Sequence, residues 1–123
     1  MPKLQSQLFR DDPKLQACLA NDAAHVTLKS TGLHVRKIQY AVLVLTGKQL
    51  PSSELDRDFY GPATARLVKE YKTRRRIINH AYQSTADDIV GKLTIAALDA
   101  EMVAVEAAER LAALRPKLPL VEI

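Results

Sequence analysis

Two stretches of this 123-residue chain carry the same spacing of residue types, thirty positions apart. DFYGPATARLV (58–68) and DIVGKLTIAAL (88–98) each place an Asp, a Gly and a Thr at intervals of three. A glycine lets the backbone turn where a side chain would clash, and the following Thr can pack against that turn while its hydroxyl bonds backwards to a carbonyl. The spacing predicts one loop-to-helix junction used twice, in pseudo-symmetric positions, by Asp58, Gly61, Thr64, Asp88, Gly91 and Thr94.

The composition favours packed helices. The chain has no Trp and only 5% aromatic residues, so its core must come from Ala, Leu, Ile and Val. Its length suits one domain with one core. We therefore predict a single all-α domain over 1–123: a small bundle of three helices with an internal pseudo-repeat, an N-terminal helix and an extended C-terminal helix.

Caps, breakers and apolar periodicity predict where these helices lie. We expect helices over 11–21, 33–47 and 61–75, and a last helix that starts near Gly91, extends through 100–115 and stops at Pro116. The segments 23–32, 48–58 and 77–88 are expected to be loops, and 116–123 a tail. The expected buried faces are Val35, Ile38, Val42 and Leu45, then Thr64, Leu67, Val68 and Tyr71, then Ile95, Leu98, Met102, Val105 and Leu111 or Ala112. Arg66, Lys69, Glu70 and Lys72 are expected to face solvent.

Three groups of residues, in this order, carry a family pattern over residues 33–99. They are Val35, Ile38, Gln39 and Val42; Asp58, Tyr60, Gly61, Thr64, Val68 and Tyr71; and Asp88, Ile89, Val90, Gly91, Thr94, Ala97 and Leu98. With its two Gly-x-x-Thr junctions, this pattern resembles the peptidoglycan-binding-like domain, a small three-helix module often appended to cell-wall hydrolases. The resemblance implies a non-catalytic module that targets the bacterial cell wall and holds the glycan or stem peptide of peptidoglycan in a shallow groove.

The residues that could hold such a ligand gather around the third predicted helix and the loop after it. Muropeptides offer apolar sugar faces, carboxylates and amides, which call for aromatic rings, cations and polar side chains. The candidate ligand-binding residues are Tyr60, Tyr71, Arg74, Arg75, Asn79, His80 and Tyr82. Two of these features also have a structural interpretation: Tyr60 and Tyr71 as core residues, and the run KTRRR (72–76) as a complement to the helix dipole.

No arrangement in the sequence predicts catalysis, a metal site or a cofactor. His25, His34 and His80 fall in different segments and form no pair with metal-ligand spacing. The single cysteine, Cys18, lies on an apolar helix face, where a buried thiol is the usual outcome. Glu101, Glu106 and Glu109 are expected on the outer face of the last helix as solubilising charge. We predict a protein that is not an enzyme.

A second class of function stays open, a protein-interaction or adaptor domain on the same fold. The last helix continues beyond Asp99, where the resemblance ends, and 100–123 is rich in apolar side chains that could meet a partner chain. The net charge of +4 is mild and no basic helix face is evident, so nucleic acid is not an expected partner. The N-terminus lacks a signal-peptide pattern and no apolar run is long enough to span a bilayer. We expect a protein that is cytoplasmic as made, or that reaches the periplasm or wall through a dedicated secretion machine.

Overall fold

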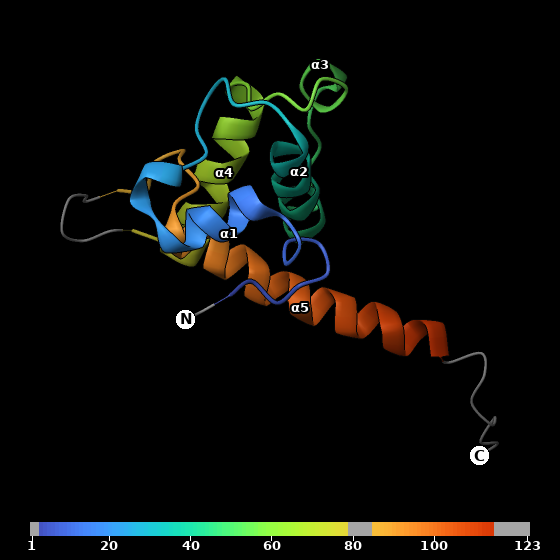
Figure 1. Ribbon diagram of the computed structural model, residues 1–123. Coiled ribbons are helices and arrows are strands. Elements are labelled where there is room, and N and C mark those ends of the chain that lie inside the picture. Colours follow the sequence, from blue (N-terminus) through green and yellow to red (C-terminus); the bar gives the residue numbers. More distant parts are fainter. Residues whose placement is uncertain (1–2, 79–84, 115–123) are drawn as a thin grey trace.

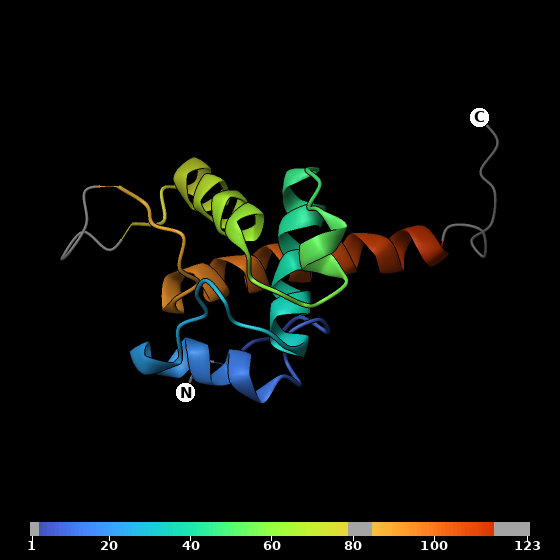
Figure 2. The ribbon, with the colours of Figure 1, turned by 90° about the horizontal axis from the view of Figure 1, so that it is seen from above.

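The computed structural model describes residues 3–78 and 85–114, and in them the predicted all-α fold is confirmed. The helices are α1 (Pro13–Ala20), α2 (Leu33–Thr46), α3 (Ser52–Leu55), α4 (Pro62–Arg75) and α5 (Lys92–Leu114), with a 3-10 turn, η1, at Asp22–Ala24. Figure 1 shows α2 and α4 standing over α5, with α1 packed against the N-terminal half of α5. Seen from above, α5 continues well beyond the bundle in one direction (Figure 2).

The predicted caps define two of these helices. Asp12 caps α1 by accepting a hydrogen bond at Oδ1 from the N–H of Leu15 at 3.0 Å, and Pro13 begins the first turn. Gly47 ends α2 in the left-handed conformation, with φ of 69°, as a glycine after a helix does. Local sequence therefore sets both boundaries.

The expected loop at 48–58 contains a short helix instead. Pro51 and the two serines that suggested a break in periodicity form the start of α3, since proline and serine favour the beginning of a helix as well as a turn. The helix ends at Leu55 and leaves Glu54 buried, at 6% exposure. This single turn positions the carboxylate that organises the neighbouring junction.

The first copy of the repeated junction is held by that carboxylate. Oε2 of Glu54 accepts a hydrogen bond from the N–H of Ala63 at 2.9 Å, and Oε1 accepts from the N–H and the hydroxyl of Thr64 at 2.8 and 2.7 Å. The hydroxyl thus bonds to a side-chain carboxylate and not, as expected, to a carbonyl. Gly61 permits the approach, since a Cβ there would lie 2.6 Å from the Glu54 carboxyl carbon. The start of α4 is therefore a carboxylate-binding site filled from within the chain.

One loop, residues 25–32, ties both junctions together. Tyr60 donates its N–H to the carbonyl of Ser30 at 2.9 Å, while Val26 and Val90 exchange two backbone hydrogen bonds of 3.0 and 2.9 Å. Tyr60 and Val90 are thirty positions apart and each directly precedes a junction glycine. α4 and α5 begin one residue after Gly61 and Gly91, as the repeat predicts.

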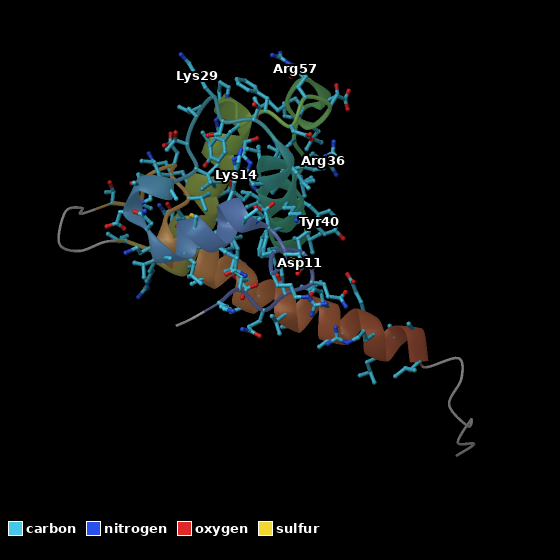
Figure 3. All side chains as sticks on the ribbon, viewed as in Figure 1. Asp11, Lys14, Lys29, Arg36, Tyr40 and Arg57 are labelled. Atoms are coloured by element: carbon cyan, nitrogen blue, oxygen red, sulfur yellow. The ribbon has the colours of Figure 1, made fainter. Side chains whose placement is uncertain are left out.

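Asp58, at the entry to the first junction, has a less common backbone conformation and an ion pair with α2. Its φ is 49°, and its carboxylate accepts two hydrogen bonds from the guanidinium of Arg36, at 2.7 and 2.9 Å. Arg36 extends from α2 on the outside of the bundle (Figure 3). The ion pair links α2 to the chain that enters the first junction.

The core follows the predicted faces, except that Leu45 and Val105 are only partly buried and that two further predictions are wrong. Val35, Ile38 and Val42 of α2, Thr64, Leu67, Val68 and Tyr71 of α4, and Ile95, Leu98 and Met102 of α5 are buried. Lys72, expected to face solvent, is only 5% exposed because an ion pair with Asp87 compensates its burial. Leu111 and Ala112, expected on the buried face, are exposed because α5 has left the bundle there.

The N-terminal segment is fastened along α5 by two carboxylates. Asp99 accepts hydrogen bonds from the N–H groups of Gln5 and Ser6, and Glu106 from those of Gln7 and Leu8. Glu106, expected only to solubilise the outer face, therefore has a structural role. The contact brings Leu4 and Phe9 into the core.

Gly61→Ala is expected to lower the free energy of unfolding by about 2 kcal/mol, because the new Cβ displaces a buried carboxylate from its hydrogen bonds. Gly91→Ala is expected to have a smaller effect. A Cβ there would lie 3.2 Å from Nε2 of His25, whose ring is partly exposed and can shift. Urea denaturation measures both. Equal losses for the two variants would contradict the account of the first junction.

Glu54→Gln is expected to cost about 2 kcal/mol at pH 7, the usual order for hydrogen bonds to a charged group. Burial raises the pKa of Glu54, but the hydrogen bonds from Thr64 and Ala63 outweigh it and lower the pKa below the ordinary 4.5. A lowered folded-state pKa means that the stabilisation is present above pH 4.5 and is lost as the pH falls through the folded-state value. The stability gap between parent and variant should therefore narrow in acid.

The control for this titration is Glu109→Gln, a change of the same chemistry at an exposed position of α5. Urea midpoints at a series of pH values compare all three proteins. If the difference in stability between the parent and Glu54→Gln stayed constant down to strongly acidic pH, the ionised form of Glu54 would not be the source of the stabilisation.

Candidate functional site

A cavity of about 590 Å³ opens at the second junction, where α5 begins. It lies between η1, the end of α4 and the segment that leads into α5. Apolar walls come from Ile77, Ile89 and Leu93; the other lining residues are Asp22, His25, Lys72, Asp87, Gly91, Lys92 and Thr94. The cavity therefore combines apolar surface with side chains of both charges at the start of a 23-residue helix.

The backbone of this second junction has the same helical start as the first. In α4 the N–H of Ala65 bonds to the carbonyl of Gly61, and in α5 the N–H of Ile95 bonds to the carbonyl of Gly91, both at 2.9 Å. The N–H groups of residues 92–94 precede that bond, so they have no acceptor within their own helix. At α4 two of the corresponding groups donate to Glu54, whereas at α5 the three residues line the cavity.

An imidazole takes the place beside the glycine that the carboxylate takes in the first junction. A Cβ on Gly91 would meet Nε2 of His25 at 3.2 Å, as one on Gly61 would meet Glu54. His25 comes from the end of η1, and the pairing of Val26 with Val90 holds it there. The second junction thus has a ring nitrogen beside the start of its helix, and this nitrogen can donate a hydrogen bond when it carries a proton.

Two nitrogen-bearing side chains at the rim of the cavity, Lys92 and His25, are loosely held. Nζ of Lys92 lies 3.5 Å and Nε2 of His25 lies 3.8 Å from the same oxygen, Oδ1 of Asp22. The side chain of Asp22 is 77% exposed, and those of Lys92 and His25 are 44% and 39% exposed. Contacts this long between solvated groups contribute little, so Lys92 and His25 can turn toward an anion in the cavity.

Lys72 has a different role in the same cavity. Its side chain is only 7% exposed, and its Nζ donates to Oδ1 of Asp87 and, at 2.7 Å, to the carbonyl of Ile89. Asp87 also accepts a hydrogen bond from the N–H of Ile89 at 3.1 Å. These bonds fix the chain that enters the second junction, so Lys72 shapes the cavity.

The two tyrosines proposed as ligand platforms are core residues. Tyr60 and Tyr71 are both fully buried, which matches the structural interpretation offered by the sequence. The hydroxyl of Tyr60 donates to the carbonyl of Asp88, joining the two junctions. A half-exposed tyrosine occurs on α2, at Tyr40 (Figure 3), and does not line the cavity. Of the other proposed ligand residues, Asn79, His80 and Tyr82 lie outside the described residues.

The two arginines proposed as an anion site are already in ion pairs. Arg75 donates to both carboxylate oxygens of Glu101, at 2.7 and 2.8 Å, and stacks 4.1 Å above the ring centre of Tyr71. Glu101, expected on the outer face of the last helix, is therefore an inter-helix partner that also accepts the Tyr71 hydroxyl. The hydrogen bond from Arg75 lowers the pKa of Glu101 below its usual value. Arg74 pairs with Glu70 one turn earlier and remains 59% exposed.

Cys18 matches its predicted role as a buried thiol. It is fully buried beneath Val90, and its Sγ lies 3.3 Å from the Val90 carbonyl. Burial raises its pKa to about 11, so it holds its proton at neutral pH and is a poor nucleophile.

Sequence reasoning named only two residues of the cavity as structural, Gly91 and Thr94, and assigned no binding role to Lys92 or Asp22. The signal that points to the cavity is the repeat itself. In the first copy of the repeat an internal carboxylate occupies the start of the helix, and in the second copy the cavity lies at that position.

Comparison of the chain with family models, with curated proteins and with solved structures finds no match. Within residues 3–78 and 85–114, no helix combines the length and apolar character needed to cross a membrane. The same described ranges hold no cluster of three or more His, Cys, Asp or Glu side chains arranged to bind a metal ion.

Arg75→Ala and Arg74→Ala form a matched pair on one helix. Arg75→Ala is expected to lower the free energy of unfolding by about 1 to 2 kcal/mol, because it removes a bidentate pair and leaves Glu101 half-buried without its cation. Arg74→Ala is expected to cost less than about 0.5 kcal/mol, as for an exposed pair on one helix. Urea denaturation measures both. Equal stability of the two variants would contradict the structural role given to Arg75.

Proposed function

We propose that this chain is a non-catalytic binding module for peptidoglycan, and that a stem-peptide carboxylate is held in the cavity at the start of α5. The proposal rests on one observation, the carboxylate of Glu54 bound at the equivalent junction. There, a Gly-x-x-Thr sequence at a helix start supplies two N–H groups and a hydroxyl to a carboxylate. The same sequence lines the cavity at α5.

The dipole of α5 and the groups around it favour an anion there. The positive end of a helix stabilises negative charge, and its first N–H groups point at the ligand. Lys92 and His25 stand beside that helix start, where each makes a long contact with Asp22. A ligand carboxylate would replace these contacts with shorter, charge-assisted hydrogen bonds.

The rest of the cavity suits a short peptide better than a bare anion. Its volume lies within the range of small-ligand sites. Ile77, Ile89 and Leu93 provide apolar surface for methyl groups, while the carboxylate is held at the helix start. Peptidoglycan stem peptides carry small apolar side chains, amides and carboxylates, which is the chemistry this surface complements.

Sedimentation with insoluble peptidoglycan tests the proposal. The parent chain is expected to co-sediment with peptidoglycan at low salt, and not with chitin, whose glycan lacks stem peptides. Removal of the stem peptides by an amidase should abolish binding. Release of soluble muropeptides by the pure chain would contradict the non-catalytic assignment.

Lys92→Glu is expected to weaken this binding at least tenfold. The acidic side chain suits a helix N-terminus, so the fold should be retained, but it repels a carboxylate in the cavity. Lys14→Glu, an exposed change on α1 (Figure 3), is the matched control with the same change in net charge. Equal binding by both variants would rule out the cavity as the site. Failure of the parent to bind peptidoglycan would rule out the function.

A further inference from the structure

The outward face of α5 carries an apolar stripe with the spacing of a coiled-coil seam. Positions 93, 96, 100, 103, 107, 110 and 114 are separated alternately by three and four residues, and they are Leu, Ala, Ala, Val, Ala, Arg and Leu. All seven are exposed. Repetition of apolar residues every 3.5 residues is the pattern by which one helix packs along another.

This stripe faces away from the bundle. The buried residues of α5 are Thr94, Ile95, Leu98, Asp99 and Met102, which lie on the opposite side of a helix with 3.6 residues per turn. Ala104 and Leu111 are also exposed and widen the stripe on one side. Leu93, Leu111 and Leu114 are 57%, 60% and 52% exposed. A helix face that contacts only solvent ordinarily carries charged or polar residues at such positions.

The C-terminal part of α5 has no support from the rest of the described chain. Every residue from 107 to 114 is exposed, and both ribbon views show this part extending beyond the bundle (Figures 1 and 2). A stretch of about two helical turns is marginal in water by itself, and packing of an apolar face is what usually stabilises one. Packing of a second helix against this part of α5 would therefore stabilise it.

We propose that the α5 stripe pairs with the α5 stripe of a second copy of this chain, antiparallel, about a two-fold axis near Val103 and Ala104. The stripe is complementary to itself in this arrangement. Leucines near one end, Leu111 and Leu114, meet Leu93 and Ala96 of the other copy, and Ala100 meets Ala107. Small residues at the centre let the two helices approach closely where they cross the axis.

Charge selects the antiparallel arrangement over the parallel one. Arg110 is the charged residue within the stripe. In a parallel pair in register, Arg110 would face Arg110 of the second copy across the seam, which is repulsive. The antiparallel pair moves the two arginines to opposite ends, each beside alanines, where its aliphatic stem covers apolar surface while the guanidinium reaches water.

The contact is long enough for a weak dimer. The stripe covers 21 rises of about 1.5 Å, or about 32 Å. A helix pair of this length buries about 1,000 Å², which is at the lower limit for a specific interface. A dissociation constant in the micromolar range is expected, so the chain should be mostly monomeric when dilute and dimeric when concentrated.

Analytical ultracentrifugation of the full chain over micromolar to sub-millimolar concentrations tests the pairing. The weight-average mass of the parent is expected to rise from 13.7 kDa toward twice that value. Ala107→Glu, in the stripe, should weaken the dimer at least tenfold, whereas Ala112→Glu, also exposed but on another face of α5, should not. Circular dichroism checks that both variants keep the parent fold.

Single cysteines test the direction. Under mild oxidation by dissolved oxygen with a copper catalyst, Ala104→Cys is expected to form a disulfide-linked dimer, and Leu114→Cys is not, because antiparallel pairing separates the two copies of residue 114. The native Cys18 is buried and stays out of the reaction. Cross-linking by Leu114→Cys but not by Ala104→Cys would overturn the antiparallel arrangement.

Two further outcomes would overturn the pairing itself. A parent that stays monomeric at every concentration would show that the stripe does not bind a second copy, and would leave a different protein as its partner. Association that Ala107→Glu and Ala112→Glu leave equally strong would place the contact on another face. The stripe and the cavity share Leu93, but neither variant changes a residue of the cavity, so ultracentrifugation without peptidoglycan measures the pairing alone.

Discussion

The carboxylate of Glu54 at the start of α4 is the interaction on which the arrangement of helices depends. It joins α3 to α4 through three hydrogen bonds. The hydroxyl of Thr64, which donates one of these bonds, also accepts a hydrogen bond from the side chain of Gln39 on α2. The same Gln39 amide donates to the carbonyl of Phe59 at 2.9 Å. Three helices and the chain between them therefore meet at one buried polar cluster. In a low-dielectric interior such a cluster specifies one arrangement, because any shift leaves a charged or polar group without a partner.

The position of α5, and with it the cavity, follows from that cluster through a short series of contacts. The first junction sets Tyr60, whose N–H pairs with Ser30 and whose hydroxyl reaches the carbonyl of Asp88. The loop that contains Ser30 continues back to Val26, which pairs with Val90 just before α5. The loop also carries His25 to its place beside Gly91. The geometry of the second junction thus depends on packing at the first, where the carboxylate of Glu54 belongs to the chain itself.

Local signals in the sequence were sufficient for α1, α2, α4, α5 and the repeat, but not for the short helix α3 or for the charged contacts. The cap at Asp12, the stop at Gly47 and the two Gly-x-x-Thr starts each act through neighbours along the chain, so spacing alone reveals them. Lys72 and Glu101 were expected to face solvent because periodicity assigns charges to the outside. Lys72 is buried against Asp87, which lies 15 positions away. Glu101 is half-buried against Arg75 and Tyr71, which lie 26 and 30 positions away. Glu54 was missed for the same reason, since its partners belong to the next helix.

The two proposed surfaces of α5 have a geometric consequence together. The cavity is at the start of the helix, and the stripe extends along its outer face to the other end. Antiparallel pairing would therefore place the two cavities of a dimer at opposite ends of the paired helices, separated by roughly the 35 Å length of α5. Peptidoglycan repeats its stem peptides along each glycan strand, so a weak dimer could bind one polymer at two points. The second contact would then be intramolecular, and the gain in avidity would exceed what either cavity provides alone. The polymer would in turn favour the dimer, because two copies bound to neighbouring stem peptides are held at a high local concentration.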